Sequence, residues 1–242
     1  MVTLKHMKKI IMTIIASALC ISAYAQADFV KKMKDGESQT LVVYGTSISS
    51  LGWGKVWVQK LGEELNARYG NNLTLYNSGK SGQNSRWALA HLQDSVIARR
   101  PDAVIIEFAT NDAVTRFDIS LDECRENTLK LIDTIKESCP ECEIILHTVC
   151  GYPLGKNAEN RPQMEEYNAV YKKIASDRGF IYVDESAIAR NIGRKQGEKV
   201  LRKFFGDGVH STEKGAVEII FPNVLKALTG DKSIEVNTKG EL

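Results

Sequence analysis

A serine, a histidine and an aspartate stand in this chain at positions where three side chains of these types can perform acyl transfer. Ser47 follows the apolar run Leu41–Tyr44, and His210 comes three residues after Asp207 in the segment "DGVH". That spacing lets the carboxylate of Asp207 turn back to the imidazole Nδ1, which leaves Nε2 to take a proton from a serine. The sequence therefore offers a nucleophile, a general base and a group that orients the base.

The chain has four histidines, and their positions distinguish them. His6 lies in an N-terminal segment with the features of a leader, and His91 lies in the middle of a predicted helix, on its outer surface. His147 lies inside a predicted strand, where a core histidine is the favoured interpretation, although the nearby strand end keeps it as an alternative base. His210 is therefore the candidate general base.

Two segments carry groups that can stabilise an oxyanion. The glycines of "NSGKSGQNS", residues 77–85, allow a tight turn in which a backbone N–H points toward the substrate. Asn111 can add a side-chain amide, and the backbone N–H of Ser47 can be a third donor. Each of these motifs is common in turns, so the prediction depends on whether the fold brings them together.

Five short apolar runs predict the strands that position these residues. The runs lack strict alternation of apolar and polar residues, as is typical of strands covered on both faces. They are Leu41–Tyr44, Leu73–Tyr76, Ala103–Phe108, Glu143–Thr148 and Phe180–Val183, and the predicted helices are Lys55–Tyr69, Ser85–Arg99, Leu121–Ser138, Pro162–Arg178 and Thr212–Leu228. This order predicts an α/β protein, a three-layer α/β/α sandwich with a five-stranded parallel sheet. Residues that follow the strands should then meet at a crevice beyond the carboxyl ends of the sheet.

The 242 residues suit one medium domain preceded by a leader. Residues 1–25 combine a cationic start, an apolar run and the small-x-small pattern Ala23-Tyr24-Ala25, which is typical of a secretory signal peptide cut before Gln26. A lipoprotein anchor at Cys20 is disfavoured because Leu19, which is not small, precedes it. We expect an exported protein, periplasmic or extracellular, with one folded domain at 26–230 and a disordered tail at 231–242.

Charge and glycine spacing argue against several partners. Without the three lysines of residues 1–25 the chain has 29 basic and 30 acidic residues, so its net charge falls from +2 to −1. No nucleic-acid partner and no stable membrane insertion after cleavage are expected. The glycines after the first strand, Gly45, Gly52 and Gly54, do not match a dinucleotide-binding fingerprint, and we expect neither a cofactor nor a metal.

Four cysteines remain after the leader, and exported proteins permit disulfides. The pattern Cys139-Cys142-His147-Cys150 resembles a zinc site, but the intervening strand residues span about 16 Å, too far for one ion. A Cys139–Cys142 bridge at one end of the sheet, a Cys124–Cys150 pair at the other, or free buried thiols are the alternatives.

The four segments, in this order, resemble the SGNH hydrolase (GDSL-like esterase/lipase) family from about Leu41 to Leu228. The resemblance implies a flavodoxin-like SGNH hydrolase fold. It also implies a nucleophile, a base with its acid, and oxyanion-hole groups: Ser47, His210 with Asp207, and Gly82 and Asn111 beside the Ser47 N–H. Two residues depart from the family pattern, because Thr46 replaces the usual aspartate of Gly-Asp-Ser and Ala109 replaces a glycine. The G-x-S-x-G elbow of ordinary α/β-hydrolases is absent.

The sequence thus predicts an exported serine esterase that hydrolyses short acyl esters, in particular acetyl esters on a carbohydrate, through an acyl-enzyme. Candidate substrate contacts are Trp53, Arg86, Trp87, Tyr152 and Lys156, although the tryptophans can equally be packing residues. The alternatives are a lysophospholipase or thioesterase of the same family, an acyltransferase with the same residues, and a carbohydrate-binding homologue with little turnover. The partner is in each case a small-molecule or polysaccharide ester.

Overall fold

A computed structural model describes residues 26–240, and the signal-peptide prediction for residues 1–25 lies outside them. Its sheet has five parallel strands in the order β2-β1-β3-β4-β5. The strands are β1 (Gln39–Gly45), β2 (Leu73–Asn77), β3 (Ala103–Glu107), β4 (Glu143–Thr148) and β5 (Ile181–Asp184). The predicted α/β class and the parallel five-stranded sheet are confirmed, and the strand ends differ from the predicted ones by at most two residues.

The central strands are buried because helices cover both faces of the sheet. In β3, which pairs with β1 and β4, every residue is buried, whereas the edge strand β2 is only partly covered. This burial explains why the central strands are apolar without alternation. The strand order reverses at β1, which pairs with β2 on one side and β3 on the other, so a crevice is expected at its carboxyl end.

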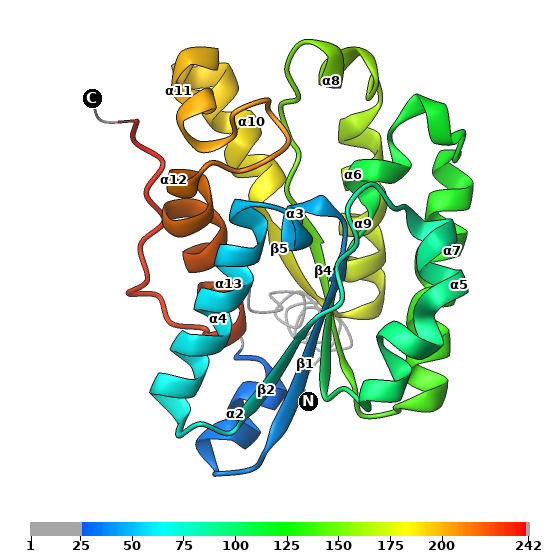
Figure 1. The fold of residues 1–242 in the computed structure, drawn as a ribbon, viewed down its shortest axis with the longest axis vertical. Coiled ribbons are helices and arrows are strands. Elements are labelled where there is room, and N and C mark those ends of the chain that lie inside the picture. Colours follow the sequence, from blue (N-terminus) through cyan, green and yellow to red (C-terminus); the bar gives the residue numbers. More distant parts are fainter. Residues whose placement is uncertain (1–25, 241–242) are drawn as a thin grey trace, which may run out of the picture.

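The helices form the outer two layers of the sandwich (Figure 1). On one face α4 packs against β2, η3 and α13, and α10 to α12 extend this layer; on the other face α5, α7 and α9 pack together. The elements of the first face are α2 (Asp28–Lys34), α4 (Trp53–Tyr69), α10 (Glu185–Gln196), α11 (Glu198–Phe204), α12 (Glu213–Gly215), the π-helical turn η3 (Ala216–Ile220) and α13 (Phe221–Thr229). Those of the second face and the connections are α3 (Ser47–Ser50), α5 (Ser85–Ser95), η1 (Ile97–Arg99), α6 (Ala109–Asp112), η2 (Thr115–Phe117), α7 (Leu121–Ser138), α8 (Lys156–Glu159) and α9 (Met164–Arg178).

Two helices between β5 and the "DGVH" segment were not predicted. Asp184 caps α10 by accepting a hydrogen bond from the backbone N–H of Ala187, and Gly197 separates α10 from α11. Both helices are rich in basic residues and bury only a narrow apolar stripe, including Ile192 and Leu201. Such a stripe is a weak sequence signal, which is why the apolar periodicity did not reveal them.

The segment 231–240, for which a disordered tail is predicted, follows the protein surface in contact with the domain. Its Ile234 and Val236 pack against the core, and Asn237 donates a hydrogen bond to the Glu218 carboxylate. The side chains of Gln196 and Lys203 donate hydrogen bonds, from Nε2 and Nζ, to the backbone carbonyls of Thr238 and Gly240. These contacts depend on apolar residues that a composition argument overlooks; residues 241–242 lie outside the described part.

The four cysteines within residues 26–240 are free thiols: Cys124, Cys142 and Cys150 are buried and Cys139 is partly buried. Cys142 precedes β4 and Cys150 follows it, so the two sulfurs stand at opposite ends of that strand. Burial raises the pKa of Cys142 and Cys150 to about 12, so both stay protonated at neutral pH. Among residues 26–240, no helix is long and apolar enough to cross a membrane.

Candidate active site

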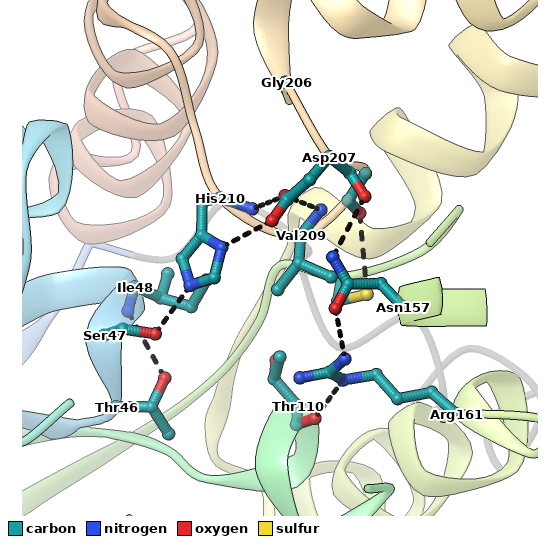
Figure 2. A network of polar contacts seen from close by, with 12 residues as sticks. Thr46, Ser47, Ile48, Thr110, Asn157, Arg161, Gly206, Asp207, Val209 and His210 are labelled. Atoms are coloured by element: carbon teal, nitrogen blue, oxygen red, sulfur yellow. Dashed lines mark hydrogen bonds and ion pairs between the residues drawn. The ribbon is translucent and has the colours of Figure 1, made fainter. Parts of the chain in front are cut away.

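Ser47, His210 and Asp207 lie in one hydrogen-bonded line beyond the carboxyl ends of the strands (Figure 2). The Ser47 Oγ lies 2.9 Å from His210 Nε2, and His210 Nδ1 lies 2.9 Å from Asp207 Oδ2. Ser47 comes from the start of α3, whereas the other two residues come from the loop before α12. Ser47 and Asp207 are 160 residues apart in the chain, so only the fold brings the two segments together.

The carboxylate of Asp207 binds both the ring and the backbone N–H of His210. Asp207 Oδ1 accepts hydrogen bonds from the backbone N–H of Val209 at 2.9 Å and of His210 at 2.7 Å. Partial burial alone would raise the pKa of Asp207, but these bonds and the one from the His210 ring hold it well below its usual value. Asp207 is therefore a carboxylate at neutral pH. Gly208, at φ +79°, allows the turn, and a Cβ there would meet the Tyr152 carbonyl oxygen at 2.4 Å.

The loop before Ser47 is held by a buried carboxylate that the sequence analysis did not identify. Glu107, at the end of β3, accepts hydrogen bonds at Oε2 from the Thr46 hydroxyl at 2.7 Å and from the Thr46 backbone N–H at 3.2 Å. The Thr46 Oγ1 in turn accepts from the Ile48 N–H and caps α3. Burial raises the pKa of Glu107 above its usual value. Thr46 thus takes its support from a carboxylate on the neighbouring strand.

Asp112 joins the short helix α6, which carries Asn111, to the segment that follows β2 and carries Gly82. Asp112 Oδ1 accepts a hydrogen bond of 2.8 Å from the Ser85 N–H, and the Asn111 Nδ2 donates to the Gln83 carbonyl at 2.7 Å. Gly82, one residue before Gln83, has φ +75°, a conformation that favours glycine. Ser47 is the first residue of α3, so its backbone N–H has no partner within the helix.

The other two described histidines lie outside this line. His147 is buried on β4, with Nε2 2.5 Å from Glu185 Oε2 and its ring edge-on to Trp57. Burial alone would lower the pKa of His147, but contact with Glu185 raises it above its usual value. His91 is exposed and stacks on Trp87 with ring centroids 4.4 Å apart. The interpretation of His147 as a core residue agrees with its ion pair.

The five candidate substrate contacts differ in availability. The Arg86 guanidinium binds the Glu123 carboxylate and the backbone carbonyls of Phe117 and Asp118, so a substrate would have to share it with these groups. Trp87 is a packing residue, half-buried between His91 and the core. Trp53, at 42% exposure, is the first residue of α4, and the half-buried Tyr152 lines a hollow of about 430 Å³. Lys156 is the exposed first residue of α8.

Sequence reasoning missed both Glu107 and Arg161. A signal for Glu107 was present, because an acidic residue inside the apolar run "AVIIEFA" must find a partner in the core. Arg161 has no comparable signal, since it stands in a polar loop, "AENRPQ", between two helices. It is nevertheless only 8% exposed.

A parallel α/β sandwich that aligns a serine, a histidine and an aspartate at its strand ends is typical of hydrolases that act on ester bonds. The chain belongs to the GDSL-like Lipase/Acylhydrolase family, whose model matches residues 43–217. The resemblance inferred from its sequence blocks is therefore confirmed, and the protein is a hydrolase of ester bonds. No curated protein matches the chain significantly.

Solved structures share the fold. A variant of an acetyl xylan esterase from Geobacillus stearothermophilus has 23% identity and a TM-score of 0.67, covering 83% of this chain and 97% of that one. A lipase/acylhydrolase from Enterococcus faecalis has 22% identity and a TM-score of 0.63, covering 78% and 93%. An α/β hydrolase enzyme from the metagenome of Lake Arreo has 22% identity and a TM-score of 0.65, covering 86% and 98%.

Proposed function

We propose that the protein is an exported serine esterase that removes acetyl or other short acyl groups from a carbohydrate. The observation that carries the proposal is the continuous line from Ser47 Oγ through His210 to Asp207, with a distance of 2.9 Å at each step. This line has the geometry needed for a serine to transfer its proton as it attacks a carbonyl.

In the first half-reaction, Ser47 Oγ bonds to the ester carbonyl carbon and its proton moves to His210 Nε2. The carbonyl oxygen becomes an oxyanion. Its proposed donors are the backbone N–H groups of Ser47 and Gly82 and the side-chain amide of Asn111. Collapse of the tetrahedral species breaks the carbon–oxygen bond to the alcohol. The leaving alkoxide takes the proton from Nε2, and the acyl group stays on Ser47.

In the second half-reaction, water replaces the alcohol. His210 Nε2 accepts a proton from water as the water oxygen attacks the acyl carbon, and the same proton returns to Ser47 Oγ when the carboxylic acid leaves. Asp207 stays ionised and stabilises the imidazolium in both halves. An alcohol in place of water would make the same residues an acyltransferase.

A hollow beside α3, the helix that begins with Ser47, supports a short, polar substrate. A hollow of about 510 Å³ beside α3 is lined by Ser50, Lys55, Asn77, Gly79, Lys80 and Ser81. These groups suit sugar hydroxyls better than an acyl chain. The exposed indole of Trp53 offers an aromatic face of the kind that stacks on sugars, and one structural neighbour is an acetyl xylan esterase.

One observation favours a second candidate, a lysophospholipase or thioesterase. Leu51, at 56% exposure, stands beside Trp53, and these two are the large apolar side chains that residues 26–240 expose. Leu51 directly follows α3, the helix that begins with Ser47, and Trp53 begins the next helix, α4. An acyl chain longer than acetyl could lie against them.

Comparison of nitrophenyl esters decides between the two candidates. We expect kcat/KM to be highest for the acetyl ester and to fall by about tenfold or more for an eight-carbon acyl group, because the lining beside α3 is polar. In an apolar groove, each additional methylene would instead stabilise the bound ester by about 0.8 kcal/mol. A steady rise with chain length would contradict the carbohydrate-ester proposal and support the lipid one. Release of acetate from acetylated xylan is the matching measurement on a polymer.

Export is part of the proposal and depends on the N-terminal pattern alone. We expect protein produced in a secreting bacterial host to begin at Gln26, because cleavage after Ala23-Tyr24-Ala25 follows the small-x-small pattern. N-terminal sequencing of the periplasmic or extracellular fraction measures this directly. An uncleaved chain, or one starting at a lipid-modified Cys20, would contradict it.

A further inference from the structure

Arg161 lies beside the candidate oxyanion groups as a buried cation. It follows α8 and precedes α9, and its side chain runs inward with only 8% of the residue exposed. Figure 2 shows the guanidinium directed toward Thr110, the residue before Asn111. Arg161 Nε donates to the Thr110 carbonyl at 2.8 Å, which fixes the guanidinium against the short helix α6.

The hydrogen-bond partners of Arg161 are neutral. They are the Thr110 carbonyl, the Asn157 Oδ1 at 3.0 Å and the Asn111 Oδ1 at 3.5 Å. Burial lowers the pKa of Arg161, yet a guanidinium remains protonated at neutral pH. The carboxylates of Asp207 and Glu107 stabilise this buried cation without a hydrogen bond to it, and a further anion beside it would lower the cost of its burial again. In the proposed reaction an anion forms at this edge of the site for as long as the tetrahedral species exists.

The contact with Asn111 sets the direction of its amide. The Oδ1 of Asn111 faces the Arg161 cation, and its Nδ2 faces the Gln83 carbonyl at 2.7 Å, on the loop that carries Gly82. A flipped amide would bring NH₂ against the cation and oxygen against oxygen, so the observed orientation is held from both ends. One Nδ2 hydrogen binds Gln83, which leaves the second for an oxyanion. A cation at Oδ1 also draws electron density from the amide and makes that N–H a stronger donor.

Arg161 is also connected, through the side chain of Asn157, to the backbone of Asp207. Arg161 Nη1 donates to Asn157 Oδ1 at 3.0 Å, and the Asn157 Nδ2 lies 3.4 Å from the Asp207 backbone carbonyl (Figure 2). The Leu154 N–H also donates to that carbonyl, at 3.2 Å. The loop of Asp207 and the helix of Asn111 are therefore connected through one guanidinium.

We propose that Arg161 is a positioning residue, whose guanidinium orients and polarises the Asn111 amide so that this amide binds the oxyanion. The inference rests on the proposed esterase function. Arg161 acts through Asn111, so its effect belongs to the transition state and not to the ground-state ester. It should therefore appear in kcat and leave KM nearly unchanged.

Three variants separate the charge from the scaffold. Arg161→Met keeps an unbranched side chain and removes the positive charge. Arg161→Lys keeps the positive charge and loses the planar guanidinium with its several N–H donors. Asn157→Ala removes the connection to Asp207 and keeps Arg161. For a nitrophenyl acetate we expect kcat to fall about 100-fold in Arg161→Met, the effect of losing an oxyanion-hole donor, with KM within about threefold of wild type. We expect about a tenfold fall in Arg161→Lys and less than that in Asn157→Ala.

Controls distinguish a lost cation from a damaged fold. Arg178, the last residue of α9, is exposed and paired with Asp133, so Arg178→Met should match the wild type. Millimolar guanidinium should restore part of kcat to Arg161→Ala, whereas sodium chloride at equal ionic strength should not. If Arg161→Met and Arg161→Ala do not fold, as judged by thermal unfolding, Arg161→Lys decides the question.

Two results would overturn the inference while the wild type remains active: kcat within threefold of wild type in a folded Arg161 variant, or equal losses in Arg161→Met and Asn157→Ala. A wild type that does not hydrolyse the acetate ester would instead contradict the proposed function. The two failures are therefore distinct.

Discussion

Replacement of Ser47 by alanine is expected to lower kcat for short-ester hydrolysis by about 10⁵-fold or more, because the variant cannot form the acyl-enzyme. Ser47 Oγ lies 2.9 Å from His210 Nε2 and makes the attacking bond in the proposed mechanism. The residual rate would come from binding and the oxyanion donors alone. Nitrophenyl acetate hydrolysis measures the loss, and a fluorophosphonate reagent that reacts with activated serines measures the nucleophile independently.

Ser138 provides the matched control for this experiment. It is the exposed last residue of α7, at the end of that helix that leads into β4, and Ser138→Ala should keep full activity and full labelling. Equal labelling of wild type and Ser47→Ala would show that another group is the nucleophile. A wild type that neither labels nor hydrolyses any ester would favour a carbohydrate-binding protein with this fold.

Asp207→Asn is expected to lower kcat by about 10³–10⁴-fold at neutral pH, because it imposes the wrong tautomer on the base. Asp207 Oδ1 accepts two backbone N–H groups, those of Val209 and His210, so the asparagine oxygen would remain there and its NH₂ would face His210 Nδ1. Nδ1 would then have to accept, and the proton would sit on Nε2. That nitrogen could no longer take the proton of Ser47.

The amide of Asp207→Asn cannot avoid this by turning over. In the flipped orientation its NH₂ would meet the two backbone donors of Val209 and His210. Steady-state kinetics on nitrophenyl acetate, with circular dichroism to check the fold, measure the effect. Activity within tenfold of wild type would mean that the carboxylate does not orient His210.

The same carboxylate links stability to pH. Its pKa is lower in the folded protein than in the unfolded chain, so the folded state is stabilised above the unfolded value of about 4 and loses that contribution as pH falls below it. Because Asp207 is close to half exposed, solvent screens part of this contribution.

The site could be predicted from sequence to the extent that it depends on strand ends. Ser47 and Asn111 each follow an apolar run, and parallel strands present their carboxyl ends at one edge. His210 and Asp207 follow no strand, but a spacing of three residues in a turn already implies their contact. The predicted strands were correct for the same reason, since buried parallel strands are the most apolar segments of the chain.

Contacts that cross between elements could not be predicted. Glu107 reaches Thr46 because Gly45 and Glu107 are register partners of adjacent strands, and no local pattern gives that register. Arg86 is occupied because the loop before α7 brings two backbone carbonyls to it. Helices α10 and α11 were missed because their apolar stripes are narrow, and their place in the fold depends on tertiary packing.

The contact between Thr46 and Glu107 also constrains how this chain can evolve. An aspartate at position 46, as in the usual Gly-Asp-Ser block, would place a second carboxylate where the Thr46 hydroxyl now lies, 2.7 Å from Glu107 Oε2 and away from water. Two buried carboxylates in contact cannot both ionise without a large cost. Thr46 and Glu107 are therefore expected to be epistatic: Thr46→Asp is unfavourable unless Glu107 changes first or in the same step.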